Sequence, residues 1–196
     1  MRLMAFSDLH CDLGAAAKLV TASKSADLVI GAGDFAQGHE GLAETMTALS
    51  PMDEKAVYVP GNNETEAALR AATRAEVRHK QGFTFEGVTF GFLGCAVPPL
   101  PPNSWGSYDM TEDEAAIGLL SFGEVDVVIS HSPPKGACDD HKDLGPLGSD
   151  ALRGYIEVMQ PQLVLCGHIH DCWGREARIG KTLVRNLGPT ANWFEL

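Results

Sequence analysis

Residues 55–66 read KAVYVPGNNETE, and this stretch carries the main structural signal of the chain. An apolar run, KAVYV (55–59), ends at Pro60-Gly61, two asparagines follow, and a segment with helical character begins at Glu64. The run is short, contains two valines and is bounded by turn residues, which predicts a buried strand that leads into a helix. The side-chain amides of Asn62 and Asn63 therefore stand where a strand ends, and they either carry chemistry or only shape the turn.

The same order of strand and helix occurs twice upstream of this stretch. We expect strands at 3–6 and 27–33, followed by helices at 15–23 and 41–49, and a third helix at 64–76. The strands are apolar on both faces, as in a parallel sheet that is covered by helices. The first half of the chain therefore predicts a βαβαβ unit.

The second half predicts another sheet. GFTFEGVTFGFLGC (82–95) alternates with a period of two, which indicates a β-hairpin. Thr111 and Glu114 form a capping box for a helix at 112–122. The remaining expected elements are strands at 125–130 and 161–166, a helix at 151–159 and a hairpin at 177–188. Strands near both ends of the chain favour two sheets with helices outside, in a single domain over residues 1–196.

Composition and charge exclude several classes of protein. The chain has 196 residues, of which 44% are hydrophobic and 21% charged, and its formal net charge is −11 at pH 7. This charge disfavours nucleic acid and anionic membranes as partners, because both attract basic proteins. The sequence shows no signal-peptide core, no long apolar run, and five cysteines without a CxxC pair, which is typical of a reducing compartment. We expect a cytoplasmic protein and leave its oligomeric state open.

Polar side chains gather where the predicted strands end. They are Asp8, His10, Asp34, Asn62, His131, His168 and His170. In open α/β sheets the carboxyl ends of the strands form the edge that binds ligands. Nitrogen and oxygen donors of this kind suit divalent Mn, Fe, Zn, Ni or Co. Seven donors are too many for one tetrahedral ion and favour two ions that share one carboxylate, although Gly-Asn is also common turn chemistry.

The order of these motifs resembles the calcineurin-like dinuclear metallophosphoesterases, in their small single-domain bacterial and archaeal branch. The chain shows Asp-x-His, Gly-Asn-x-Glu and Gly-His-x-His, with Gly-Asp and an isolated His in the expected places between them. The resemblance implies an α/β fold, a four-layer αββα sandwich with two mixed β-sheets flanked by helices. It also implies two ligand sets joined by Asp34: Asp8, His10 and His170 for one ion, and Asn62, His131 and His168 for the other.

We therefore expect a metal-dependent phosphoesterase that acts on a small phosphate-ester substrate, a phosphodiester rather than a monoester. In such an enzyme a hydroxide that bridges two divalent metal ions attacks phosphorus in line, and the ions offset the charge that develops. The alternative is a non-catalytic metal-binding interaction scaffold on the same fold, which a large apolar patch over the metal edge would favour. A nuclease is disfavoured by the net charge. Neither the substrate nor the physiological metal follows from the sequence.

The residue after the ligand asparagine departs from the family pattern. Most members have a histidine there, whereas this chain has Asn63, whose amide cannot protonate a leaving group. We expect Asn63 to cap the following helix and to contact the substrate phosphate without acting as the acid. Among the histidines outside the motifs, we expect His79 in solvent, and the roles of His39 and His141 stay open.

Overall fold

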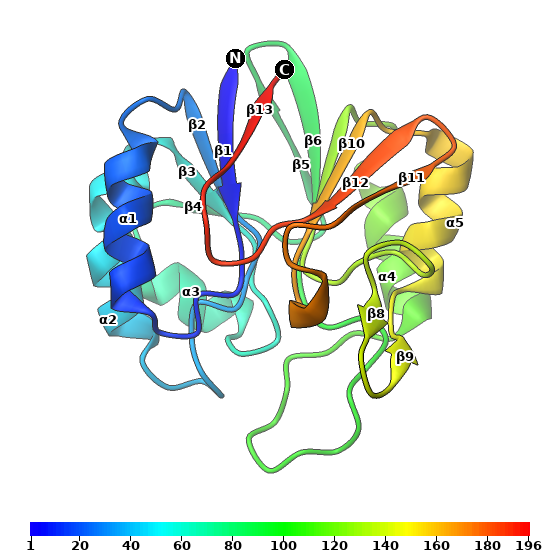
Figure 1. Cartoon of the computed structure of the whole chain (residues 1–196), viewed down its shortest axis with the longest axis horizontal. Coiled ribbons are helices and arrows are strands. Elements are labelled where there is room, and N and C mark those ends of the chain that lie inside the picture. Colours follow the sequence, from blue (N-terminus) through cyan, green and yellow to red (C-terminus); the bar gives the residue numbers. More distant parts are fainter.

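Two β-sheets pack face to face, and each carries helices on its outer side (Figure 1). The computed structural model describes residues 1–196. The first sheet has the spatial order β13 (Asn192–Glu195), β1 (Arg2–Phe6), β2 (Leu28–Gly31), β3 (Ala56–Tyr58) and β4 (Glu76–Val77). Its outer face is covered by α1 (Leu13–Ser23), α2 (Leu42–Leu49) and α3 (Glu66–Ala72), with a 3-10 helix, η1 (Ser50–Lys55), after α2.

The second sheet contains the later strands of the chain. Its spatial order is β11 (Glu176–Ile179), β12 (Thr182–Asn186), β10 (Leu163–Cys166), β7 (Val127–Ser130), β6 (Val88–Leu93) and β5 (Gln81–Phe85). Its outer face is covered by α4 (Glu112–Ser121) and α5 (Asp150–Met159). A small hairpin of β8 (Asp140–His141) and β9 (Gly145–Pro146) and a 3-10 helix, η2 (His170–Cys172), lie outside both sheets.

Both sheets are mixed. In the first, β1, β2, β3 and β4 are parallel, and β13 runs antiparallel beside β1 with Phe194 opposite Leu3. In the second, β6, β7, β10 and β12 are parallel, and the two hairpins add an antiparallel strand at each edge. The predicted four-layer αββα sandwich is therefore confirmed, as are the hairpins at 82–95 and 177–188.

Three apolar layers hold the sandwich together. The central layer joins the inner faces of the two sheets, where Leu3, Ile30, Phe90 and Leu165 are fully buried. The other two layers lie between each sheet and its helices. Burying one such large side chain stabilises the fold by roughly 1.5–3 kcal/mol. Because the central strands are buried on both faces, only the loops at their ends are free to carry polar groups.

The helix after β3 differs from the prediction. It spans Glu66–Ala72 rather than residues 64–76, and its N-cap is Thr65, whose side chain accepts a hydrogen bond from the backbone N–H of Ala68. The prediction that Asn63 caps this helix is therefore wrong. The chain then leaves the helix early to form β4, a strand that the sequence analysis did not identify.

His79 is also placed differently from the prediction. Its side chain is buried rather than in solvent, and its Nδ1 accepts a hydrogen bond of 2.9 Å from the backbone N–H of Gly94. Burial lowers the pKa of His79 to about 4, so this ring is a neutral structural group. The capping box of Thr111 and Glu114 at the start of α4 is confirmed. No helix is both long and apolar enough to cross a lipid bilayer.

Candidate metal centre

The seven predicted ligands come from loops at one edge of the sandwich. Each loop leaves the carboxyl end of a parallel strand, and the strands are β1, β2, β3, β7 and β10. The residues are Asp8, His10, Asp34, Asn62, His131, His168 and His170, and the structure brings all of them together. The edge is continuous across both sheets because loops from the two sheets are hydrogen-bonded to each other, for example Cys95 N–H to Pro60 O and His168 N–H to Asp8 Oδ1.

One group consists of Asp8, His10 and His170. One possible ligand atom from each lies within 4.8 Å of those of the other two. The Nε2 atoms of His10 and His170 are 3.0 Å apart. His170 is exposed and His10 is half-buried, so this group faces solvent.

A second group consists of Asp34, His131 and His168, again with ligand atoms within 4.8 Å of one another. Asn62 completes it, because its Oδ1 lies 3.0 Å from both His131 Nε2 and His168 Nδ1. Asp34 and His131 are buried and His168 is half-buried, so this group lies deeper than the first.

Asp34 lies between the two groups. Its Oδ2 is 3.6 Å from His10 Nε2, and its Oδ1 is 3.4 Å from His131 Nε2. Backbone N–H groups of Asn62 and Asn63 donate to Oδ1 at 2.8 and 2.9 Å, and the Asn63 amide donates to Oδ2 at 2.8 Å. The carboxylate is thus fixed with one oxygen toward each group.

The hydrogen-bond acceptors of the deeper group fit a cation. His131 Nδ1 lies 2.8 Å from the carbonyl oxygen of Ala32 and must carry a proton to bond with it. In the neutral ring, Nε2 then has only a lone pair, and it faces Asn62 Oδ1 and Asp34 Oδ1, which are also acceptors. With His131 neutral, these three acceptors face one another; a divalent ion satisfies all of them at once, and without it the ring needs a second proton.

Several of the predicted ligands have unusual backbone conformations. Asp8, His10, Asp34 and His168 have φ angles of 55°, 44°, 58° and 67°, in the left-handed region that non-glycine residues rarely adopt. Each such residue costs of order 1–3 kcal/mol, and strain of this kind collects at functional sites. The fold therefore holds four of the seven predicted ligands in unfavourable conformations.

The loop that carries Asp34 is anchored by Glu64, which the sequence analysis did not assign. The buried carboxylate of Glu64 accepts from the backbone N–H groups of Asp34, Phe35, Ala36 and Gly61, at 2.7–3.0 Å. The sequence signal for this role was the place of Glu64 in the Gly-Asn-x-Glu motif, because an acidic residue that follows a buried strand needs hydrogen-bond donors around it. Gly61 is required here, since a Cβ at this position would lie 2.1 Å from Asp34 Oδ1.

Charge in the centre is shared unequally among the imidazoles. Burial opposes a charge on His131, but the Asp34 carboxylate outweighs it and raises the pKa of His131 to about 9. Burial and the neighbouring His131 lower the pKa of His168 to about 3. Burial acts against ionisation of Asp34, yet His131 holds the pKa of this carboxyl well below its ordinary value. Without a cation, the centre is therefore an ion pair of Asp34 and His131 beside a neutral His168.

This ion pair predicts a pH effect on the metal-free protein. The folded-state pKa of His131, about 9, lies above its ordinary value of 6.5, so its contribution is complete below pH 6.5 and is lost as the pH rises through 9. We expect the free energy of unfolding to fall by roughly 3 kcal/mol over this range. Urea unfolding in the presence of a chelator measures it. His131→Gln should flatten the slope and His141→Gln should not; a slope that survives in His131→Gln would contradict the assignment.

The other histidines lie outside the centre. His39 Nε2 is 2.7 Å from the carbonyl oxygen of Gly106, and its ring packs edge-on against Trp105. Its backbone N–H donates to the carbonyl oxygen of Asn63, which places it at the rim. His141 lies in β8, where its Nδ1 accepts from the Asp143 N–H. Neither side chain contacts a predicted ligand.

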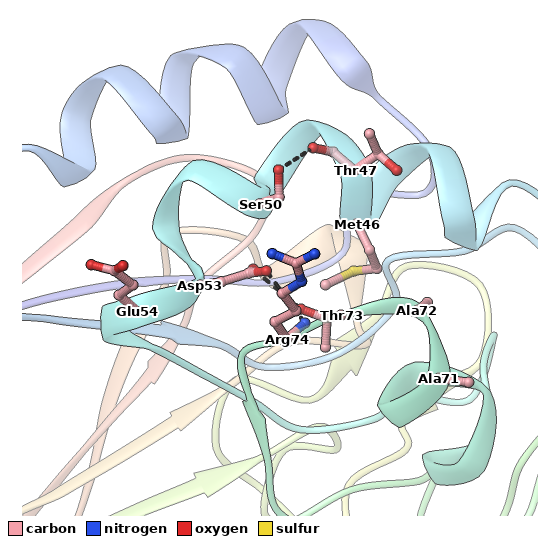
Figure 2. Close-up of a pocket in the computed structure, with 9 residues that line it drawn as sticks. All are labelled: Met46, Thr47, Ser50, Asp53, Glu54, Ala71, Ala72, Thr73 and Arg74. Atoms are coloured by element: carbon pink, nitrogen blue, oxygen red, sulfur yellow. Dashed lines mark hydrogen bonds between the residues drawn. The ribbon is translucent and has the colours of Figure 1, made fainter.

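A large surface cavity lies elsewhere in the molecule. It has a volume of about 610 Å³ and opens between η1, α2 and α3 (Figure 2). None of the seven predicted ligands lines it. One of its lining residues is Asp53, and both carboxylate oxygens of Asp53 already accept hydrogen bonds, from the Thr73 hydroxyl and the Arg74 N–H.

A family model matches almost the whole length of the chain. Residues 1–195 match the family model described as the calcineurin-like phosphoesterase superfamily domain. No curated protein sequence matches the chain.

Solved structures with the same fold include a protein from Thermus thermophilus with a TM-score of 0.73 and 17% identity, covering 98% of this chain and 97% of that one. A dimetal phosphatase from Danio rerio has a TM-score of 0.64 and 11% identity, with 96% and 88% covered. An archaeal phosphodiesterase has a TM-score of 0.51 and 15% identity, with 96% and 84% covered. At these identities the likeness concerns the fold alone.

Proposed function

Because the chain belongs to the calcineurin-like phosphoesterase superfamily, a family of metal-dependent hydrolases, we propose that it is a phosphodiesterase with two divalent metal ions. The observation that carries this proposal is the convergence of four imidazoles, an amide oxygen and two carboxylates at one edge of the sandwich. We also propose that residues 1–196 act as one domain, since the centre takes residues from both ends of the chain.

The proposed ligand sets follow the two observed groups. Asp8, His10 and His170 would hold one ion, Asn62, His131 and His168 the other, and Asp34 both. A pair of such ions, when bound, lowers the pKa of water to supply a nucleophile and offsets charge on phosphate oxygens. The protein's own contribution is orientation: the Ala32 carbonyl fixes the ring of His131, and Asn63 and the backbone fix Asp34. The proposed metal is Mn, Fe, Zn, Ni or Co, all of which suit these nitrogen and oxygen donors.

A diester substrate is favoured by the charges around the centre. No Lys or Arg side chain is hydrogen-bonded or ion-paired to the seven residues; the paired arginines, Arg2, Arg70, Arg78, Arg153 and Arg185, bind glutamates elsewhere. A phosphodiester carries one negative charge and a monoester up to two, so a site without a paired lysine or arginine suits the diester better.

Asn63 limits the leaving groups that the proposed enzyme can expel. Its Oδ1 accepts from the Gly38 N–H at 2.8 Å and its Nδ2 donates to Asp34, so it positions the proposed shared carboxylate. The contact of Asn63 with substrate stays a prediction, and an amide cannot supply a proton in any case. The loss of a general acid typically costs about 10²–10⁴-fold, and the cost is smallest for leaving groups that depart without protonation.

We therefore expect turnover of bis-p-nitrophenyl phosphate in the presence of Mn²⁺ and weak turnover of alkyl phosphomonoesters. Release of p-nitrophenol and of inorganic phosphate measures the two reactions. Asn63→His should raise the rate mainly for poor leaving groups, because it restores a proton donor. Faster hydrolysis of alkyl monoesters than of the activated diester would contradict the proposal.

The structure offers no support for the scaffold alternative. An exposed apolar groove lies between α4 and α5, where Leu120 and Val158 are 66% and 78% exposed. This groove is on the outer helices and not at the strand ends that carry the centre. Loaded protein that bound two ions but hydrolysed no phosphate ester in a broad screen would reopen this alternative.

A further inference from the structure

We propose that each half of the metal centre has its own outer support, meaning a side chain that binds no ion but fixes a ligand. Trp173 supports Asp8 and His170, and Ser107 with Asp109 supports Asn62. The inference rests on the proposed two-ion function. Beyond that function, we infer that the affinities of the two ions are set separately, by residues that lie far apart in the sequence.

Trp173 contacts two of the proposed ligands of the same ion. Its indole Nε1–H donates to Asp8 Oδ2 at 3.0 Å, and its ring lies 4.4 Å from the ring of His170 at an angle of 34°. The indole N–H can only donate, and together with the Ser7 hydroxyl on the same oxygen and the His168 N–H on Oδ1 it fixes the carboxylate in one orientation. The ring contact restricts rotation of the His170 imidazole.

The backbone at Gly188 also packs closely against Trp173. A Cβ at Gly188 would lie 2.7 Å from Cγ of the indole, so only glycine leaves room for the ring at this distance. Gly188 is itself tied to the start of the centre, because its N–H donates to the Ser7 hydroxyl at 3.0 Å. Trp173 therefore packs against both His170 and Gly188, with 39% of its surface exposed. A side chain held in this way can position its neighbours.

Ser107 and Asp109 act on the second group. The Asn62 amide Nδ2 donates to Ser107 Oγ at 3.2 Å, and Ser107 in turn donates its only hydroxyl proton to Asp109 Oδ1. The other oxygen of Asp109 accepts from the Leu100 N–H at 3.0 Å. Because an ionised carboxylate can only accept, the direction of this chain of hydrogen bonds is fixed from Asn62 to Asp109.

That direction decides which end of the Asn62 amide faces the metal. With Nδ2 bonded to Ser107, the carbonyl oxygen is directed at His131 and His168, at 3.0 Å from each. A serine that was free to donate to Asn62 would favour the opposite orientation, which would present an NH₂ group to a cation. The loop holds Ser107 in place, since Asn103 Oδ1 accepts from the N–H groups of Gly106 and Ser107 at 2.9 and 3.1 Å.

The test is metal titration of full-length variants that have been stripped with a chelator. Wild type should bind two Mn²⁺ ions by calorimetry. Trp173→Phe keeps a ring but loses the N–H, and Ser107→Ala loses the acceptor for Asn62. Each should weaken one ion by about 10–100-fold and change the other by less than threefold. Ser107→Thr should restore the affinity, and Trp193→Phe, at a tryptophan that stacks on Arg2, should have no effect.

A ligand variant shows which ion each support acts on. In a His170→Ala background, Ser107→Ala should still weaken the remaining ion, whereas Trp173→Phe should add nothing. Melting curves of the metal-free variants check that each one folds. Wild type that binds no pair of ions would refute the proposed function itself. Suppose instead that wild type binds two ions, and that Trp173→Phe and Ser107→Ala change the two affinities equally or not at all. That result would refute only the outer supports.

Discussion

Replacing Asp34 with alanine is expected to lower occupancy of both ion sites and to reduce phosphodiester hydrolysis by about 10³-fold or more. Asp34 is the carboxylate whose two oxygens face His10 in one group and His131 in the other, at 3.6 and 3.4 Å. Two-ion catalysis contributes several kcal/mol of charge stabilisation, and each 1.36 kcal/mol is a factor of about ten in rate. Metal content after desalting and turnover of bis-p-nitrophenyl phosphate are the two measurements.

Asp53→Ala is the matched control for this experiment. Asp53 is also a carboxylate that accepts a backbone N–H, from Arg74, but it lines the separate cavity between η1, α2 and α3 (Figure 2). It should leave metal content and turnover unchanged. If Asp34→Ala retained two ions and wild-type turnover, the shared-carboxylate assignment would be wrong.

Glu64→Ala is expected to cost about 4 kcal/mol or more of folding stability. The change leaves the N–H groups of Gly61, Asp34, Phe35 and Ala36 without their acceptor in a buried loop. An unsatisfied buried donor costs about 1–3 kcal/mol, and water entering the space left by the side chain offsets part of the total. Urea unfolding of the metal-free protein isolates this effect from any change in metal binding.

Glu66→Ala serves as the control, two residues away. Its carboxylate pairs with Arg70 on the surface of α3, and an exposed pair of this kind contributes about 0–1 kcal/mol. A cost for Glu64→Ala as small as that for Glu66→Ala would show that the backbone donors find other partners. That result would refute the anchoring role of Glu64.

Much of the fold could be predicted because its strands are continuous apolar runs with turn residues at their ends. The strands predicted at 3–6, 27–33 and 161–166 became β1, β2 and β10, and Thr111 with Glu114 marked the start of α4 by a purely local interaction. The order of polar residues at the strand ends also led to the groups that the structure brings together. Their assignment as ligands stays a prediction.

What the sequence could not show depends on contacts between distant residues. Asn63 was predicted to cap a helix because a helical segment follows it in the sequence. Its side-chain amide instead forms hydrogen bonds with Gly38 and Asp34, 25 and 29 positions away. His79 looked solvated because charged residues surround it in sequence, yet its ring is buried beside Gly94. The bond from Trp173 to Asp8 spans 165 positions. No local pattern encodes a pairing of that separation.

The pairing of β1 with β13 has a consequence for how the chain is made. Met4, in β1, lies opposite Trp193, and the amino group of Met1 contacts the carbonyl oxygen of Leu196 at 2.8 Å, where the two ends meet in Figure 1. During synthesis β1 emerges long before β13, so it waits for this outer neighbour while the strands and helices between them follow. Closing so long a loop slows folding, as in other proteins of high contact order. The group of Asp8 and His10 is likewise incomplete until His170 emerges, so the candidate metal centre assembles late.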